Sequence, residues 1–332
     1  QLYQGRLHEA VGQQAAAEAV YRHLLRTATG SKITVQARQG LHRLEAFERE
    51  QRQRSLAQAT REPRDTELGL LVLEPVPAEA KSLAAKNFAQ IMKIDLYSAQ
   101  LQLPTHSWRL YRTGLIGELR FYGQALQAAG ISAFWFSLPD IRQVQVLQVR
   151  YLQADASQVT AVYQNEAAET GSFTFAWSEV TQLVEGLLPL FEEVLDLDAR
   201  GRLHRKLKTQ DHAQVCDLHL PSKQCILRLV DANYQFQHGI NLVAGDASVL
   251  SNQNTSWANW KRLMGLLTRC LPQTPVSSNF NFFAESALEH IDRLKLSQSH
   301  INLFRRIESE WDVAFHLYSC LVFLKRNSSI LS

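Results

Sequence analysis

Two cysteines, an aspartate and a histidine lie close together in the segment VCDLHLPSKQC, residues 215–225. These residue types can bind zinc. Alternation dominates the segment, however, so that Cys216 shares one face of a predicted strand with two leucines while Asp217 and His219 point to the other face. No two cysteines have the spacing of about two to four residues that is typical of structural zinc sites. We therefore predict a hairpin with its turn at PSKQ, in which Cys216 and Cys225 are small buried apolar residues, and no metal or other cofactor.

Two further sets of residues could do acid–base chemistry. Asp231 and His238 precede a polar loop of glycine, asparagine and serine, and Glu308, Asp312 and His316 follow one another at intervals of four. The latter three would share one face of a helix, where they could hold a metal or polarise a water, or simply pair with each other on a partly exposed surface. No nucleophile elbow, phosphate loop or dinucleotide fingerprint accompanies either set. An enzyme of unfamiliar type, with its site near Asp231/His238 and Asp312/His316, is thus the alternative hypothesis.

Basic residues gather in the run at 200–208, which could contact phosphates. The run contains Arg200, Arg202, Arg205, Lys206 and Lys208. Asp196 and Asp198 precede it and Asp211 follows it, and the net charge of the whole chain is only +3. A solvated linker is the interpretation that this pattern favours, and nucleic acid is not the expected partner.

Composition is that of an ordinary globular protein, with 332 residues of which 45% are hydrophobic and 20% charged. The four cysteines are too few and too scattered for a secreted disulfide framework, which favours a reducing compartment and a cytoplasmic location. No run approaches the roughly 20 apolar residues that cross a bilayer, so no membrane span is expected. The chain starts at Gln1 rather than methionine, and a preceding segment would be invisible in this sequence.

Residues 1–60 predict a helical hairpin with a turn near residues 29–31, together with the first part of a polar linker that extends from Arg49 to Glu67. Ala15 and Ala19 would permit close packing, and Tyr21 would fill a groove with Leu24 and Leu25. In these features the first helix resembles a tetratricopeptide unit, although no array of repeats follows. The resemblance implies a protein-binding groove that includes Tyr21.

Residues 68–140 predict a small βααβαβ module: a strand, two helices, a strand, a helix and a final strand, with the helices on one face of the sheet. The stretches KIDLYSAQLQLP and GELRFYGQALQAAGISAFWF carry a family pattern at Leu96, Ala99, Leu101, Pro104 and Ala129-Gly130. In this pattern and in element order, residues 68–138 resemble the C-terminal domain of the bacterial ribosomal stalk protein, a fold shared with the adaptor of the Clp protease. The glycine-rich corner and most surface lysines of that family are missing here. The resemblance implies a protein-docking surface without a catalytic site.

Residues 141–332 predict a β-rich region and then a helical part. Strands are expected at 144–153, 158–164 and 172–180, forming a second small antiparallel sheet. Pro189 would limit any helix that runs through residues 183–197. The C-terminal third predicts three helices in one layer, with apolar stripes that begin at Trp257, Phe283 and Phe304.

The sequence as a whole predicts a multi-module α+β protein that binds other proteins as an adaptor, scaffold or assembly factor, and no catalytic residues are assigned. The expected partner-binding residues are Phe88, Met92, Tyr97 and Leu101 on the helices of the βααβαβ module, and Tyr21 in the N-terminal hairpin.

Overall fold

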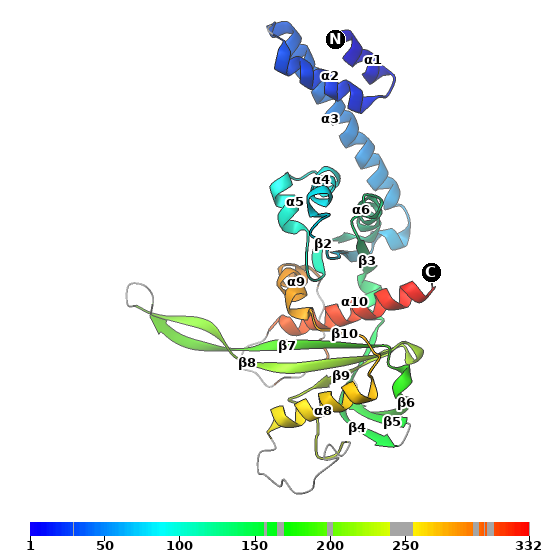
Figure 1. The fold of residues 1–332 in the computed structure, drawn as a ribbon, viewed down its shortest axis with the longest axis vertical. Coiled ribbons are helices and arrows are strands. Elements are labelled where there is room, and N and C mark those ends of the chain that lie inside the picture. Colours follow the sequence, from blue (N-terminus) through cyan, green and yellow to red (C-terminus); the bar gives the residue numbers. More distant parts are fainter. Residues whose placement is uncertain are drawn as a thin grey trace. The chain divides into compact units, whose positions relative to one another are not determined.

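The computed structural model describes residues 1–28, 30–155, 158–164, 169–197, 202–239, 255–294, 299–301, 303 and 309–331. The chain has an α+β fold, as predicted. It divides into two compact units, Gln1–Thr66 and Glu67–Ser332 (Figure 1).

The first unit consists of helices α1 (Leu2–Ala10), α2 (Gln14–Thr27) and α3 (Ser31–Ala59). Tyr21 of α2 lies at its centre, because Gly5 of α1 and Gly40 of α3 leave room for the two edges of the tyrosine ring. The Tyr21 hydroxyl donates a hydrogen bond of 2.8 Å to Glu9, which also forms an ion pair with Arg43. The predicted hairpin is thus extended by a third helix, and α3 continues to Ala59 through much of the predicted linker.

The second unit begins with the predicted βααβαβ order of elements. These are β1 (Leu68–Leu73), α4 (Lys81–Met92), α5 (Leu96–Gln102), β2 (Arg109–Leu115), α6 (Ile116–Ala128) and β3 (Ala133–Ser137). The three strands pair antiparallel in the order β2-β1-β3. Gly130 has a φ of +77° just after α6, a left-handed conformation that glycine adopts without strain, and it ends this helix where the sequence indicated.

A larger sheet follows, reached through the short helix α7 (Leu138–Arg142). Its strands are β4 (Gln145–Asp155), β5 (Gln158–Gln164), β6 (Thr170–Ala176), β7 (Gln182–Leu197), β8 (Leu203–Leu220), β9 (Cys225–Val230) and β10 (Val276–Ser277). They lie in the order β10-β7-β8-β9-β4-β5-β6. The predicted strands β4, β5 and β6 do pair antiparallel with each other. They do not form a small sheet, because β9 of the cysteine hairpin pairs in parallel with β4 and joins both groups of strands.

Helices cover this sheet on both faces. Helices α9 (Phe280–Leu294) and α10 (Trp311–Leu331) share a core with the small sheet on one side and with alternate residues of β7, β8 and β9 on the other. They lie between the two sheets (Figure 1), and the Leu110 amide of β2 donates a 3.0 Å hydrogen bond to Ser286 of α9. Helix α8 (Ser256–Cys270) packs on the opposite face, against Cys216, Leu218 and Leu220.

The predicted single layer of three C-terminal helices was thus wrong. The central strands β8 and β9 are buried on both faces, and a sheet of that kind needs a helix on each side. Within the described part of the chain, none of the helices combines the length and apolar character needed to cross a membrane.

Candidate functional site

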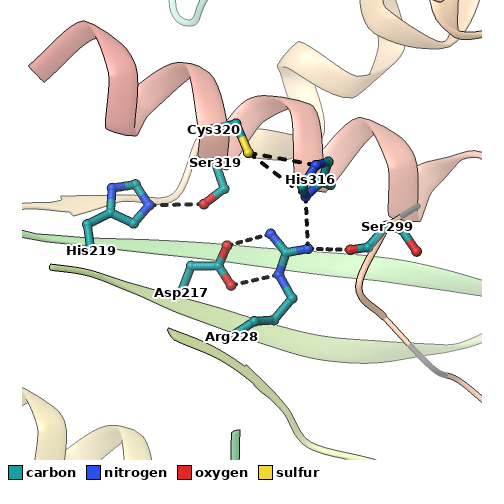
Figure 2. A network of polar contacts seen from close by, with 7 residues as sticks. All are labelled: Asp217, His219, Arg228, Ser299, His316, Ser319 and Cys320. Atoms are coloured by element: carbon teal, nitrogen blue, oxygen red, sulfur yellow. Dashed lines mark hydrogen bonds and ion pairs between the residues drawn. The ribbon is translucent and has the colours of Figure 1, made fainter. Parts of the chain in front are cut away.

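A buried ion pair stands at the centre of the larger sheet. Asp217 of β8 and Arg228 of β9 are opposite each other in the antiparallel register, and both side chains are completely buried. Arg228 Nε lies 2.9 Å from Asp217 Oδ1 and Nη2 lies 2.6 Å from Oδ2, which is the bidentate geometry of a strong charge-assisted pair (Figure 2). The third guanidinium nitrogen, Nη1, donates to the carbonyl oxygen of Ser299.

Helix α10 approaches this pair with polar side chains of its own. His316 Nδ1 lies 3.5 Å from Arg228 Nη1, and the Cys320 sulfur lies 3.8 and 3.9 Å from the two ring nitrogens of His316 (Figure 2). One turn along the helix, Ser319 forms a 3.0 Å hydrogen bond with His219 of β8. These contacts join the sheet to α10.

Both histidines of this network are neutral at physiological pH. Burial lowers the pKa of His219 to about 4, with a smaller contribution from the positive charge of Arg228. Burial also holds the pKa of His316 well below its ordinary value, again helped by Arg228. A neutral imidazole does not act as a general acid near pH 7, although it can accept a proton.

The cysteines of this region are buried thiols. Burial raises the pKa of Cys225 to about 11 and of Cys320 to about 12, and that of Cys216 well above its ordinary value. A thiol with a raised pKa is protonated at neutral pH and is a weak nucleophile. The prediction that Cys216 and Cys225 are buried in a hairpin is confirmed. Among the described residues, no three histidine, cysteine or acidic side chains are grouped so that they could hold a metal.

The network joins β8 and β9 to helix α10 and lies in the interior of the second unit. His219, Asp217, Arg228 and Ser319 expose at most 1% of their surface, so a substrate has no access to them. A fully paired buried ion pair contributes little net stability over an apolar core, but it penalises any packing of α10 that leaves a charge without its partner.

The acid–base residues predicted from the sequence each have their own contacts. The Asp231 amide donates to the Gln214 carbonyl, and its half-buried carboxyl group has a pKa raised by burial. The His238 ring lies tilted beside the Tyr151 ring, with the ring centroids 5.9 Å apart. The prediction of a partly exposed helix face at Asp312 and His316 was wrong, since both are buried; Glu308 lies outside the described residues.

A cavity of about 470 Å³ opens beside α8, at residues 185–187 of β7 and 214–215 of β8. It contains Glu185, whose pKa is raised by burial, and Lys261, whose ammonium lies 5.2 Å from the centre of the Trp257 ring. Its lining has no histidine or cysteine and does not include the buried network. This cavity offers a mixed apolar and polar surface.

The predicted partner-binding residues of the βααβαβ module divide into two groups. Tyr97 and Leu101 of α5 are 71% and 61% exposed and lie one helical turn apart, so they form one surface, while Ala99 of the same helix is buried. The turn that precedes α5 is fixed by Asp95, which accepts a 2.9 Å hydrogen bond from the Ser98 amide.

Phe88 and Met92 belong to the core of the module instead. Both are buried, and the Phe88 ring packs edge-on against Tyr111 with centroids 5.0 Å apart. Tyr21, the predicted groove residue of the N-terminal unit, is likewise enclosed by α1 and α3. These three side chains offer no surface to a partner, because each apolar stripe that suggested a docking face is the face that packs inward.

The basic run is part of strand β8, so the prediction of a linker was wrong. Arg205 forms a 3.3 Å ion pair with Glu193 of β7, and Lys208 lies opposite Glu192 in the register. Arg200 lies outside the described residues. Acidic residues of β7 thus accompany the bases of β8.

Comparison with known proteins adds no assignment. No protein-family model matches the sequence, and no curated protein has a significant match to it.

The Asp217–Arg228 pair was not recognised from the sequence, although a signal was present. Arg228 interrupts the otherwise apolar strand CILRLV, and Asp217 stands between apolar residues of the preceding strand. When each strand of a predicted hairpin contains one charged residue of opposite sign, and the other face of the hairpin is apolar, the two charged residues are expected to pair across the strands.

Proposed function

We propose that this protein is a non-enzymatic protein-binding adaptor or scaffold, and that it docks a partner through Tyr97 and Leu101 of α5. The observation that carries this proposal is the exposure of both side chains on one face of a helix whose opposite face is fixed in the core. Large exposed aromatic and aliphatic residues one turn apart are the usual anchors when a helix inserts into an apolar groove of another protein.

Two other observations support the proposal. The charged groups at the centre of the larger sheet, Asp217 and Arg228, are completely buried and paired with each other. The resemblance of residues 68–138 to the stalk and Clp-adaptor fold also implies a docking role, and α5 lies in this part of the chain. The partner expected at this surface is a protein with an apolar groove, rather than nucleic acid.

The proposal is tested by capture of partners with the full chain and with the Tyr97→Glu and Leu101→Glu variants. Gln124→Glu, at an exposed position of α6, introduces the same charge elsewhere in the module and serves as the matched control. We expect each α5 variant to weaken a specific partner by about 30-fold, which corresponds to about 2 kcal/mol for an anchor residue, and the control to bind normally.

All variants should keep the wild-type unfolding midpoint, because the changed side chains are exposed. Equal partner recovery by wild type and both α5 variants would reject α5 as the docking surface.

A further inference from the structure

Strands β7 and β8 extend beyond the larger sheet as a two-stranded arm. Strand β10 pairs with β7 only at Leu183 and Val184, and β9 pairs with β8 only from Val215 to Leu220. Within the described strands, β7 and β8 therefore pair only with each other from Leu187 onward, and Figure 1 shows this arm projecting from the sheet. An isolated pair of strands is marginally stable in water, so its apolar face gains from being covered.

The arm has one apolar face. Leu195, Leu203 and Leu207 are 70%, 71% and 55% exposed. In the register, Leu195 is opposite Arg205 and Leu207 is opposite Glu193. Because cross-strand partners share a face and alternate residues return to it, the three leucines lie on one face together with the Glu193–Arg205 ion pair. We call this the leucine face.

Charge on the arm is separated between its two strands. The acidic residues of the β7 part are Glu192, Glu193 and Asp196, and the basic residues of the β8 part are Arg202, Arg205, Lys206 and Lys208. A two-fold arrangement that joined the arms edge to edge would place β7 against β7 or β8 against β8, with like charges together. The charges therefore oppose edge pairing of two copies and leave the faces for contact.

We infer that the leucine face binds the leucine face of a second copy of this chain. The face is self-complementary, since each copy offers leucines to leucines and both an arginine and a glutamate to the opposite charges of its partner. Isologous two-fold contact requires this kind of self-complementary surface. A nucleic acid fits less well, because the leucines make no phosphate contact and the acids of β7 repel phosphates.

Sedimentation velocity of the full chain over a concentration series tests the inference. We expect a reversible dimer for the wild-type chain and a monomer for the double variant Leu195→Ser/Leu203→Ser. The matched control is Lys206→Ser/Lys208→Ser, which changes the opposite face of the same strand pair and should still dimerise. A monomeric wild-type chain overturns the inference and would indicate that the leucine face binds a different protein. A dimer that persists in the Leu195→Ser/Leu203→Ser variant also overturns it.

Charge exchange gives a second, independent readout. Glu193→Arg leaves only positive charge on the leucine face and Arg205→Glu leaves only negative charge, so each variant alone should dimerise at least tenfold more weakly. An equal mixture of the two should recover a heterodimer. A mixture that stays monomeric while both variants remain folded contradicts face-to-face contact. Because α5 is unchanged in all of these variants, failure here is distinguishable from failure of the proposed docking function.

Discussion

Replacing Asp217 by asparagine keeps the shape of a completely buried side chain but removes the charge that balances Arg228. Removing one partner of a buried ion pair typically costs about 3–5 kcal/mol, because the remaining charge stays in the interior without compensation. We therefore expect the free energy of unfolding of the second unit to fall by about that amount. Since domains are stable by only about 5–15 kcal/mol, a large part of the total would be lost.

The same pair predicts strong non-additivity. Arg228→Met should also be destabilising, because Asp217 then stays buried and the Ser299 carbonyl loses its donor. The double variant Asp217→Asn/Arg228→Met contains neither charge. Its free energy of unfolding should fall only because buried polar groups lose their partners, at about 1–3 kcal/mol for each group. It should therefore be at least about 2 kcal/mol more stable than the sum of the single losses implies.

Urea denaturation followed by tryptophan fluorescence is the appropriate assay, because all six tryptophans belong to the second unit. Lys223→Gln removes the ammonium of an ion pair with Glu179 at the surface of the second unit and serves as the control, with an unchanged midpoint expected. A loss below about 1 kcal/mol for Asp217→Asn, or simple additivity in the double variant, would refute the assignment of a coupled buried pair.

Three other properties follow from the packing. The free energy of unfolding of the second unit should fall by up to about 3 kcal/mol as the pH is lowered from about 6.5 to about 4, because His219 takes up a proton in the unfolded chain but not in the folded one. His219→Phe should lose this part of the pH dependence, and an unchanged slope of stability against pH would contradict the assignment. Gly40→Ala places a Cβ 2.5 Å from the Tyr21 ring and should lower the stability of the first unit by about 1–3 kcal/mol, measured as faster hydrogen exchange in α2. Gly30→Ala is the control, because no atom lies nearer than 3.8 Å to its added Cβ. Equal exchange rates in both variants would count against the close packing. In the folded chain, a thiol reagent should modify Cys270 first, since the other three cysteines are buried. Rapid modification of more than one thiol would contradict the burial of those three cysteines.

Local patterns in the sequence determined much of the secondary structure. The βααβαβ order over residues 68–137 follows from short apolar runs, helical spacing and turn residues such as Gly130. The hairpin of Cys216 and Cys225 follows from alternation around Pro221. In these segments, propensity and periodicity agree with the final packing, and such agreement between levels makes a local prediction reliable.

Periodicity could not show which side of each element would be covered. Phe88 and Tyr97 both lie on apolar helices, but only the tertiary packing buries the first and exposes the second. Likewise, the alternation around Asp217 indicated a polar face, whereas α10 covers that face and supplies His316 beside the Asp217–Arg228 pair.

The longest strands show the same division. Residues 182–220 contain a proline and a dense group of charges, which locally suggest an interrupted helix and a linker. In the structure, Gln182–Leu197 form β7 and Leu203–Leu220 form β8. Each strand is stabilised by hydrogen bonds to the other across the sequence, and local propensity does not include those bonds. The sequence by itself thus determined the type of each element where local and global preferences agree. The tertiary structure decided the sheet order, the buried ion pair and the exposed leucine face, because these three features depend on contacts between residues far apart in the chain.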